Sequence, residues 1–207
     1  MELVDSAYPS TDLAVSGPNE ATVEFLRASG CRRVAEIGVY RGDTAEKLAE
    51  HLAGEGELHL FDFEDRVAEV SARLKAAGHE NVVAHGNSRK LMDSYNWSLM
   101  RLLCDHPEPI FDYVFLDGAH TWSQDALACC LADRLLADGG YLDFDDYWWT
   151  IARSPSMNPE AFPATDKLYT EEQIEERQVA LVVDLLVRRD PRYEEVVENK
   201  IFRKRAT

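Results

Sequence analysis

The feature that most constrains the fold is a regular alternation of short apolar segments and amphipathic segments from about residue 18 onward. Apolar runs of this length are typical of buried strands, and the segments between them have helical spacing. The predicted strands are 31–39, 56–63, 81–86, 111–118 and 141–146, the predicted helices are 43–52, 64–78, 88–104, 121–140 and 171–190, and 192–205 form a final pair of strands. Because one helix separates consecutive strands, we predict an α/β, doubly wound, mostly parallel sheet with helices on both faces.

Length and composition indicate a single domain. The 207 residues are enough to bury a core, and no repeat, low-complexity tract or linker interrupts them. We therefore treat 1–207 as one domain, in which 1–17 form an N-terminal flap or a tail. The one long connection without clear periodicity is 147–169, which holds three prolines and several aromatic residues. Connections of this length are more often functional than idle, so we expect a loop that takes part in ligand binding.

The charge balance excludes two classes of partner. A net charge of −16 opposes sequence-independent binding to nucleic acid or to anionic membranes, since both need a cationic surface. No run of about 18 apolar residues occurs, and the N-terminus lacks the basic region of a signal peptide. The cysteines, which show no CxxC spacing, are Cys31, Cys104, Cys129 and Cys130. We expect reduced thiols and a cytoplasmic location.

A glycine-containing loop, EIGVYRGDT, connects the first predicted strand to the first predicted helix at residues 36–44. Gly38 and Gly42 can adopt backbone angles that other residues resist, and they allow a ligand to approach the main chain. Asp43 is expected to cap the helix, with Glu46 completing a capping box. The pattern alone is weak, because a tight strand-to-helix turn explains it equally well.

The charges of this loop argue against a dinucleotide. A pyrophosphate binds at the electropositive N-terminus of a helix, but Glu36 and Asp43 lie near that end and would repel it. The third glycine of the dinucleotide-binding pattern is also absent. The two carboxylates suit a zwitterionic ligand that carries ammonium and sulfonium charges. A nicotinamide-dependent oxidoreductase is therefore the least favoured function.

Polar residues end the next two predicted strands. Asp62 follows Gly42 by 20 residues, where an acidic side chain is expected to accept hydrogen bonds from ribose hydroxyls. The alternative is that Asp62 caps the following helix. Asn87 and Ser88 end the third strand, where they either face an adenine ring or cap the helix after them.

Acidic residues cluster at the ends of the fourth and fifth predicted strands. The stretch YLDFDDYWW, residues 141–149, places Asp143, Asp145 and Asp146 within four positions, and Asp117 ends the preceding strand. Because the carboxyl ends of parallel strands meet at one edge, Asp117, Asp145 and Asp146 are expected to converge on one small volume. Oxygen ligands in this number suit Mg²⁺. The alternative is that Asp117 serves the cofactor alone and the aspartate pair is a solvated helix cap. Asp143 lies on the face of Asp145, either behind the metal ligands or turned away.

Together these segments resemble a known family. The run from Glu36 to Gly42, the acidic Asp62, FLDGAH at 115–120 and DDY at 145–147 resemble class I S-adenosylmethionine-dependent methyltransferases. Within these the chain is most similar to metal-dependent sugar O-methyltransferases related to macrocin O-methyltransferase, over about residues 30–150. It differs in being shorter than many macrolide-sugar enzymes and in lacking an obvious auxiliary domain.

The resemblance implies a Rossmann-like, seven-stranded sheet with an antiparallel C-terminal strand, S-adenosyl-L-methionine as cofactor, and Mg²⁺ at Asp117, Asp145 and Asp146. Segment 147–169 is then the acceptor-site loop. The implied cofactor-binding residues are Glu36, Gly38, Tyr40, Gly42, Asp62, Asn87, Ser88 and Asp117.

His120, three residues past Asp117, is the candidate catalytic residue. Its spacing places the imidazole beside the metal rather than among the ligands, where it can take the proton of a hydroxyl made acidic by Mg²⁺. A histidine after a strand is more often a capping or surface residue, and its place in DGAH favours catalysis here. Related catechol-type enzymes commonly use a lysine in this region, so Lys90 and Lys167 are the alternative bases.

The favoured function is methyl transfer to a hydroxyl of a sugar or glycoside, with a mannose- or rhamnose-containing saccharide or a glycosylated natural product as acceptor. The resemblance is the only ground for sugars, although Tyr147, Trp148 and Trp149 are suited to stack on a sugar ring or on adenine. The alternatives are a catechol-type O-methyltransferase acting on adjacent aromatic hydroxyls, and a non-catalytic cofactor-binding scaffold. A homodimer, formed through the N-terminal segment or the helix at 171–190, is the default expectation.

Overall fold

The computed structural model describes residues 17–206. Its strands are β1 (Arg33–Ile37), β2 (Glu57–Phe63), β3 (Val82–Asn87), β4 (Phe111–Leu116), β5 (Leu136–Phe144), β6 (Tyr193–Val197) and β7 (Ile201–Lys204). Its α-helices are α1 (Glu20–Ser29), α2 (Asp43–Leu52), α3 (Glu64–Ala76), α4 (Tyr95–Asp105), α5 (Trp122–Leu135), α6 (Thr165–Leu168), α7 (Glu171–Glu175) and α8 (Gln178–Val182). A 3₁₀ turn, η2 (Ile151–Arg153), and a π-helical turn, η3 (Val183–Val187), complete the set. None of the helices in this part of the chain is long and apolar enough to cross a membrane.

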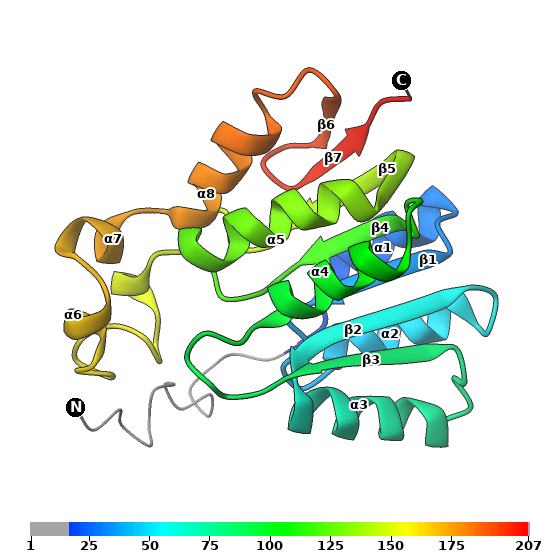
Figure 1. Cartoon of the computed structure of the whole chain (residues 1–207), viewed down its shortest axis with the longest axis horizontal. Helices are drawn as coiled ribbons and strands as arrows, with labels where there is room; N and C mark the ends of the chain where they lie inside the picture. The colour runs from blue at the N-terminus through cyan, green and yellow to red at the C-terminus, as the bar shows by residue number, and fades with distance from the viewer. Residues whose placement is uncertain (1–16, 207) are drawn as a thin grey trace.

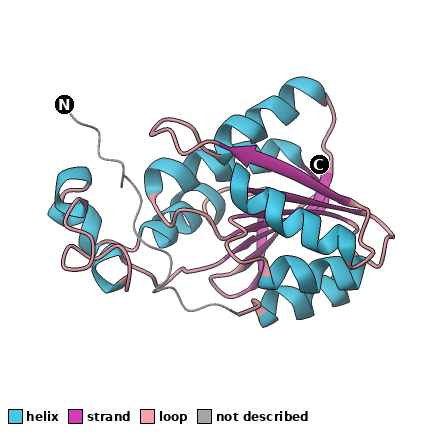
Figure 2. Cartoon of the chain, turned by 90° about the horizontal axis from the view of Figure 1, so that it is seen from below, coloured by secondary structure: helices cyan, strands magenta, loops and turns pink. Residues whose placement is uncertain are grey.

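The strands form one seven-stranded sheet in the order β3-β2-β1-β4-β5-β7-β6 (Figure 1). The first five strands pair in parallel, whereas β7 runs antiparallel to both β5 and β6. Helices cover both faces of the sheet (Figure 2). The predicted Rossmann-like, mostly parallel fold with an antiparallel C-terminal strand is therefore confirmed.

Alternation along the strands divides the core into two layers. On β2, Leu60 belongs to the cluster formed with α1, α2 and α3, whereas its neighbour Phe61 belongs to the cluster formed with α4, α5 and α8. On β4, Phe115 and Val114 divide in the same way. All four side chains are fully buried. Successive side chains of a strand point to opposite faces, so an apolar run without polar interruption is what a sheet covered on both sides requires.

Two predicted helices are wrong in extent. The helix expected at 88–104 begins only at Tyr95, because Ser94 accepts a hydrogen bond from the Asn96 amide as the N-cap. Upstream, Asp93 accepts hydrogen bonds from the backbone N–H and the hydroxyl of Ser88 at 2.7 and 2.6 Å, which closes a loop instead. The helix expected at 121–140 ends at Leu135, and β5 takes up the residues that follow.

The single long helix expected at 171–190 is divided into α7, α8 and η3. Thr170 and Gln173 form a capping box at the start of α7, and Glu176, with φ −80° and ψ 145°, ends it in an extended conformation. The side chain of Gln178 then donates to the Gln173 carbonyl at 2.6 Å, which holds the break. Helical spacing continues across this break, so periodicity alone could not reveal it.

Candidate functional site

The glycine loop after β1 lies tightly against the end of β4. Gly38 has φ +91°, and a Cβ there would lie 1.8 Å from the carbonyl oxygen of Asp117. Its amide donates to the Phe61 carbonyl at 2.8 Å, so the loop spans the ends of β2, β1 and β4. Only glycine fits this close approach of two backbones. The loop thus places main-chain atoms beside the ends of three strands.

Gly42 rather than Asp43 is the N-cap of α2, which corrects the predicted capping box. Gly42 has φ +80° and no side-chain cap hydrogen bond, and Asp43 is already the first helical residue. A Cβ on Gly42 would lie 2.6 Å from the Val70 side chain of α3. The close packing of α2 against α3 at this point therefore requires glycine, and it displaces the cap by one residue.

Asp62 holds the glycine loop in place. One carboxylate oxygen accepts hydrogen bonds from the Val39 and Tyr40 amides, both at 2.9 Å, and the other accepts from the Phe63 amide at 2.6 Å. Arg66 lies 3.5 Å from the second oxygen. Phe63, not Asp62, precedes α3 as its N-cap, so the alternative reading of Asp62 as the helix cap is wrong. Ribose binding by Asp62 stays a prediction.

Glu36 and Asn87 leave buried acceptor atoms without partners. Glu36 is 1% exposed, and its Oε2 has no hydrogen-bond partner among residues 17–206. Burial, together with the charge of Asp62, raises the pKa of Glu36 well above its usual range. Asn87 Oδ1 is likewise buried and unpartnered within the same residues. Such groups are costly unless a ligand satisfies them, and an ammonium and an amino group would do so. Both residues therefore fit S-adenosylmethionine.

Asp117, His120 and Asp146 come together at the ends of β4 and β5. The His120 Nε2 lies 3.4 Å from Asp146 Oδ2 and 4.0 Å from Asp117 Oδ1. One ligand atom from each of the three lies within 4.8 Å of the others, a spacing that suits one cation. His120 and Asp146 both have φ +57°, a left-handed conformation that is costly for side chains of this size. Strain of this kind is concentrated at functional sites.

Asp145 stands beside this group rather than within it. Its amide donates to the Leu116 carbonyl at 3.0 Å, which ties the end of β5 to β4, and its carboxylate lies 3.9 Å from Lys200 Nζ. Burial, followed by the charges of Asp145 and Asp146, raises the pKa of Asp117 well above its usual range. The charges of Asp145 and Asp146 therefore both act on the Asp117 carboxylate, but only Asp146 lies in the close group with Asp117 and His120. A metal site formed by Asp117, Asp145 and Asp146 stays a prediction.

Asp143 lies below this edge in the core and is fully buried. One oxygen accepts from the Thr22 hydroxyl at 2.7 Å and from the Tyr113 hydroxyl at 2.6 Å, and the other lies 2.9 Å from Lys200 Nζ. Of the two orientations considered for Asp143, the structure shows the one turned away from the ligand edge. The contact of Asp143 with Lys200 could not be predicted from the sequence, because Lys200 lies after β6, far from Asp143 along the chain.

A buried pair holds the loop that carries His120. The Tyr95 hydroxyl donates to Asp125 at 2.5 Å, and the Ala119 amide points at both, 3.2 Å from Tyr95 and 3.3 Å from Asp125. A Cβ on Gly118 would lie 2.6 Å from the Tyr95 hydroxyl, so glycine is required there as well. Sequence reasoning missed this pair, since neither residue stands in a recognisable motif.

A cavity of about 330 Å³ opens beside the aspartates. Its lining combines three consecutive aromatic residues with polar side chains: Phe144, Asp145, Asp146, Tyr147, Trp148, Trp149, Glu198, Asn199 and Lys200. The Trp149 ring lies 5.1 Å from the His120 ring, and Trp148 is 63% exposed. By contrast, Lys90 and Lys167 are exposed side chains of a turn and of α6.

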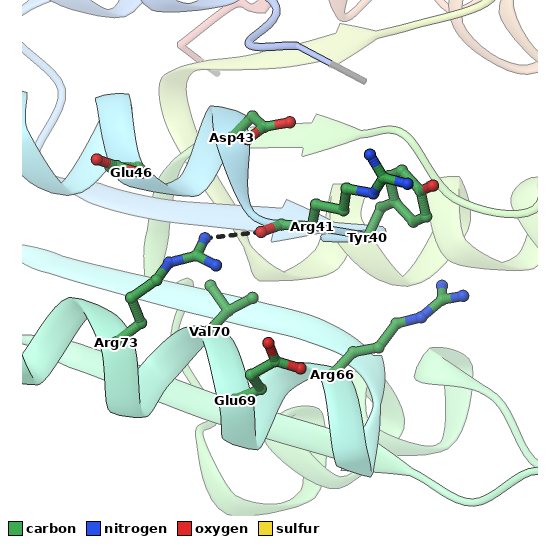
Figure 3. Close-up of a pocket in the computed structure, with 8 residues that line it drawn as sticks. All are labelled: Tyr40, Arg41, Asp43, Glu46, Arg66, Glu69, Val70 and Arg73. Atoms are coloured by element: carbon green, nitrogen blue, oxygen red, sulfur yellow. Dashed lines mark hydrogen bonds between the residues drawn. The ribbon is translucent and has the colours of Figure 1, made fainter. Parts of the chain in front are cut away.

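A larger cavity, of about 650 Å³, lies between α2 and α3 on the outer side of the glycine loop (Figure 3). Arg73 donates to the Arg41 carbonyl at 2.7 Å across it. Its charged lining residues are three arginines and three acids, namely Arg41, Arg66, Arg73, Asp43, Glu46 and Glu69. The charged groups of this groove are therefore equally divided between the two signs, and the smaller cavity is the one that adjoins the aspartates.

Comparisons with known proteins agree with this geometry. An O-methyltransferase from Bacillus cereus in complex with S-adenosylhomocysteine has 18% identity and a TM-score of 0.63, covering 94% of this chain and 84% of its own. The O-methyltransferase TomG from Streptomyces achromogenes, involved in tomaymycin synthesis and solved with S-adenosylmethionine, has 22% identity and a TM-score of 0.62, covering 95% and 83%. A search of curated proteins finds no match.

These likenesses establish the fold, which is that of S-adenosylmethionine-dependent O-methyltransferases. A family described as a methyltransferase domain matches residues 35–147, which is more than half of the 207-residue chain. That segment runs from β1 through the aspartate pair, and it contains every residue of the candidate cofactor and metal sites. The chain therefore belongs to this methyltransferase family.

Proposed function

We propose that the protein is a Mg²⁺-dependent O-methyltransferase that uses S-adenosyl-L-methionine to methylate a hydroxyl of a sugar or glycoside. The family and the shared fold support methyl transfer. The structures with 18% and 22% identity were solved with S-adenosylhomocysteine and S-adenosylmethionine, which supports the cofactor. The unpartnered carboxylate oxygen of Glu36 and the loop held by Asp62 support binding at the ends of β1 and β2.

The acidic residues fit a divalent ion. Asp117, Asp145 and Asp146 supply hard oxygen ligands, and the Asp117 and Asp146 carboxylates lie within reach of one small volume. When bound, S-adenosylmethionine supplies the electrophilic methyl group, and Mg²⁺ makes a nearby hydroxyl more acidic. His120 then takes the proton of the acceptor hydroxyl at Nε2, the atom that faces Asp146. The Trp149 ring packs against the His120 ring at an angle of 50°, which limits the orientations open to the imidazole.

The cavity beside the aspartates is the single observation that carries the acceptor class. Three aromatic residues, Tyr147, Trp148 and Trp149, line it together with Glu198 and Asn199. Aromatic faces pack on the apolar faces of a sugar ring, while carboxylate and amide groups hydrogen-bond to its hydroxyls. The volume of about 330 Å³ lies at the small end of the range for ligand sites, which suits one sugar unit.

Calorimetric titration with S-adenosylhomocysteine, in Mg²⁺ and again in chelator, is the first test. Asp146→Ala is expected to abolish the Mg²⁺ response and to retain the fold, whereas Asp105→Ala, an exposed acid at the end of α4, serves as the matched control. Methyl transfer to a panel of glycosides and catechols then identifies the acceptor. Turnover of catechols alone would exclude the sugar proposal, and cofactor binding without any metal response would exclude the Mg²⁺ requirement. A homodimer and a cytoplasmic location stay predictions.

A further inference from the structure

Lys200 brings a cation from the end of the chain into the acidic edge of the sheet. It lies in the turn between β6 and β7, directly after Asn199, which has φ +57°. Backbone pairing holds this turn against β5, since the Phe144 amide donates to the Lys200 carbonyl at 2.9 Å. The side chain is only 16% exposed. The turn and its backbone hydrogen bond to β5 therefore fix the position of Lys200, and its ammonium is not a mobile surface charge.

The ammonium of Lys200 lies near two aspartates, Asp143 of β5 and Asp145 just after its end. Its Nζ lies 2.9 Å from Asp143 and 3.9 Å from Asp145. It also lies 3.3 Å from the Phe144 carbonyl and 5.2 Å from the centre of the Phe115 ring, both of which favour a cation. Two carboxylates this near in the chain repel each other, and the contact of each with Lys200 offsets the repulsion. Asp143 and Asp145 thus coexist through a cation that the chain itself supplies.

The same ammonium also adjoins the volume in which a divalent ion would lie. Lys200 lines the cavity together with Asp145 and Asp146. A divalent ion on these carboxylates would be repelled by the positive charge of Lys200, whose Nζ lies 3.9 Å from Asp145. Even when screened as in bulk water, this repulsion corresponds to roughly a tenfold loss of affinity. The contact therefore has two opposite consequences, since it organises Asp145 and it disfavours the metal.

We propose that Lys200 is a positioning residue that holds Asp145 and weakens the binding of the divalent ion, so that the metal exchanges instead of remaining as a permanent structural component. This inference rests on the proposed function, because it assumes that the aspartates bind a metal. The buried carboxylate of Asp143 already has Lys200 as its counter-ion, so it needs no bound ion for folding. The ion is then expected to bind most favourably together with an acceptor that supplies further oxygen ligands.

The effect can be measured without any acceptor by titrating the full chain with Mn²⁺. The electron paramagnetic resonance signal of free Mn²⁺ reports how much of the ion is bound and gives its Kd. Lys200→Met removes the charge, and Lys200→Arg keeps it. Lys204→Met is the matched control, because Lys204 is a buried lysine of the same hairpin. Its Nζ donates to the carbonyls of Asp133 and Leu136 at 2.6 and 3.0 Å, away from the aspartate edge. We expect the Mn²⁺ Kd of Lys200→Met to fall about tenfold, and that of the other two variants to stay within about twofold of wild type.

Lys200→Met leaves Asp143 buried without its counter-ion, which is destabilising enough to unfold some proteins. Lys200→Gln removes the same charge and keeps an N–H donor for Asp143, so it is expected to show the same tighter Mn²⁺ binding in a folded chain. Calorimetric binding of S-adenosylhomocysteine verifies the fold of each variant. Unchanged or weaker Mn²⁺ binding by Lys200→Gln, with this binding intact, would overturn the role of Lys200 and leave the proposed function standing. If wild type and all variants bind S-adenosylhomocysteine but no Mn²⁺, the metal requirement fails first, and the inference fails with it.

Discussion

Replacing Gly38 with alanine tests how rigidly the glycine loop is pressed against β4. The new Cβ would lie 1.8 Å from the carbonyl oxygen of Asp117 and 2.5 Å from its carbonyl carbon, and backbone atoms cannot rotate away as a side chain can. A φ of +91° adds a conformational penalty of about 1–2 kcal/mol for any residue with a Cβ. Displacing a packed strand end adds about 1–3 kcal/mol. We therefore expect Gly38→Ala to lose roughly 4 kcal/mol of unfolding free energy.

Gly30→Ala provides the control. Gly30 also has a positive φ, +75°, at the end of α1, but a Cβ there would meet no atom within 4 Å. This variant should lose only the conformational penalty, about 1 kcal/mol. For a chain of this size the two losses correspond to falls in Tm of roughly 10 °C and 3 °C. Urea unfolding and calorimetric binding of S-adenosylhomocysteine measure the outcome, and equal losses for the two variants would refute the close contact.

Three further predictions concern the buried polar groups. Burial, and then the charge of His59, lower the pKa of His85 to about 4, so the stability that the neutral His85 contributes is complete above pH 6.5 and is lost as the pH falls toward 4. Urea unfolding at pH 7 and pH 5 should show a loss of about 2 kcal/mol, which should be smaller in His85→Gln. Tyr95→Phe removes the donor to Asp125 and should cost about 1–3 kcal/mol in the same assay, and an unchanged value would mean that the pair does not hold the His120 loop. Asp62→Ala frees two loop amides, so binding of S-adenosylhomocysteine should weaken at least about tenfold by calorimetry, and unaltered affinity would contradict its role.

The fold could be predicted because a sheet that is buried on both faces requires a continuous apolar run in each of its strands. Val114 and Phe115 are both fully buried although they face opposite layers, so β4 reads as a continuous apolar run. The prediction of a helix over 88–104 was wrong because local hydrogen bonds outweighed the apolar spacing. Leu91 and Met92 have helical spacing yet are 53% and 92% exposed, because local hydrogen bonds among Ser88, Asp93 and Ser94 replace the helix.

Some residues of the candidate site could be predicted from the sequence, and others could not. Asp62, Asp117 and Asp146 each end a strand, so topology alone brings them to one edge of the sheet. Lys200 could not be foreseen, since its contact with Asp143 depends on where the final hairpin inserts and on the conformation of its turn. Long-range pairing of this kind leaves no periodic signal in either segment.

The insertion of β7 between β5 and β6 has a consequence for synthesis of the chain. β7 (Ile201–Lys204) follows β6 in the chain but occupies a position inside the sheet, so the nascent polypeptide cannot pair β5 on this side before residue 204 has left the ribosome. Until then one edge of β5 stays unpaired, and Asp143 lacks its counter-ion Lys200. Premature termination before codon 200 would therefore leave an exposed β-strand and an uncompensated buried charge, a combination that quality-control proteases and chaperones are suited to detect.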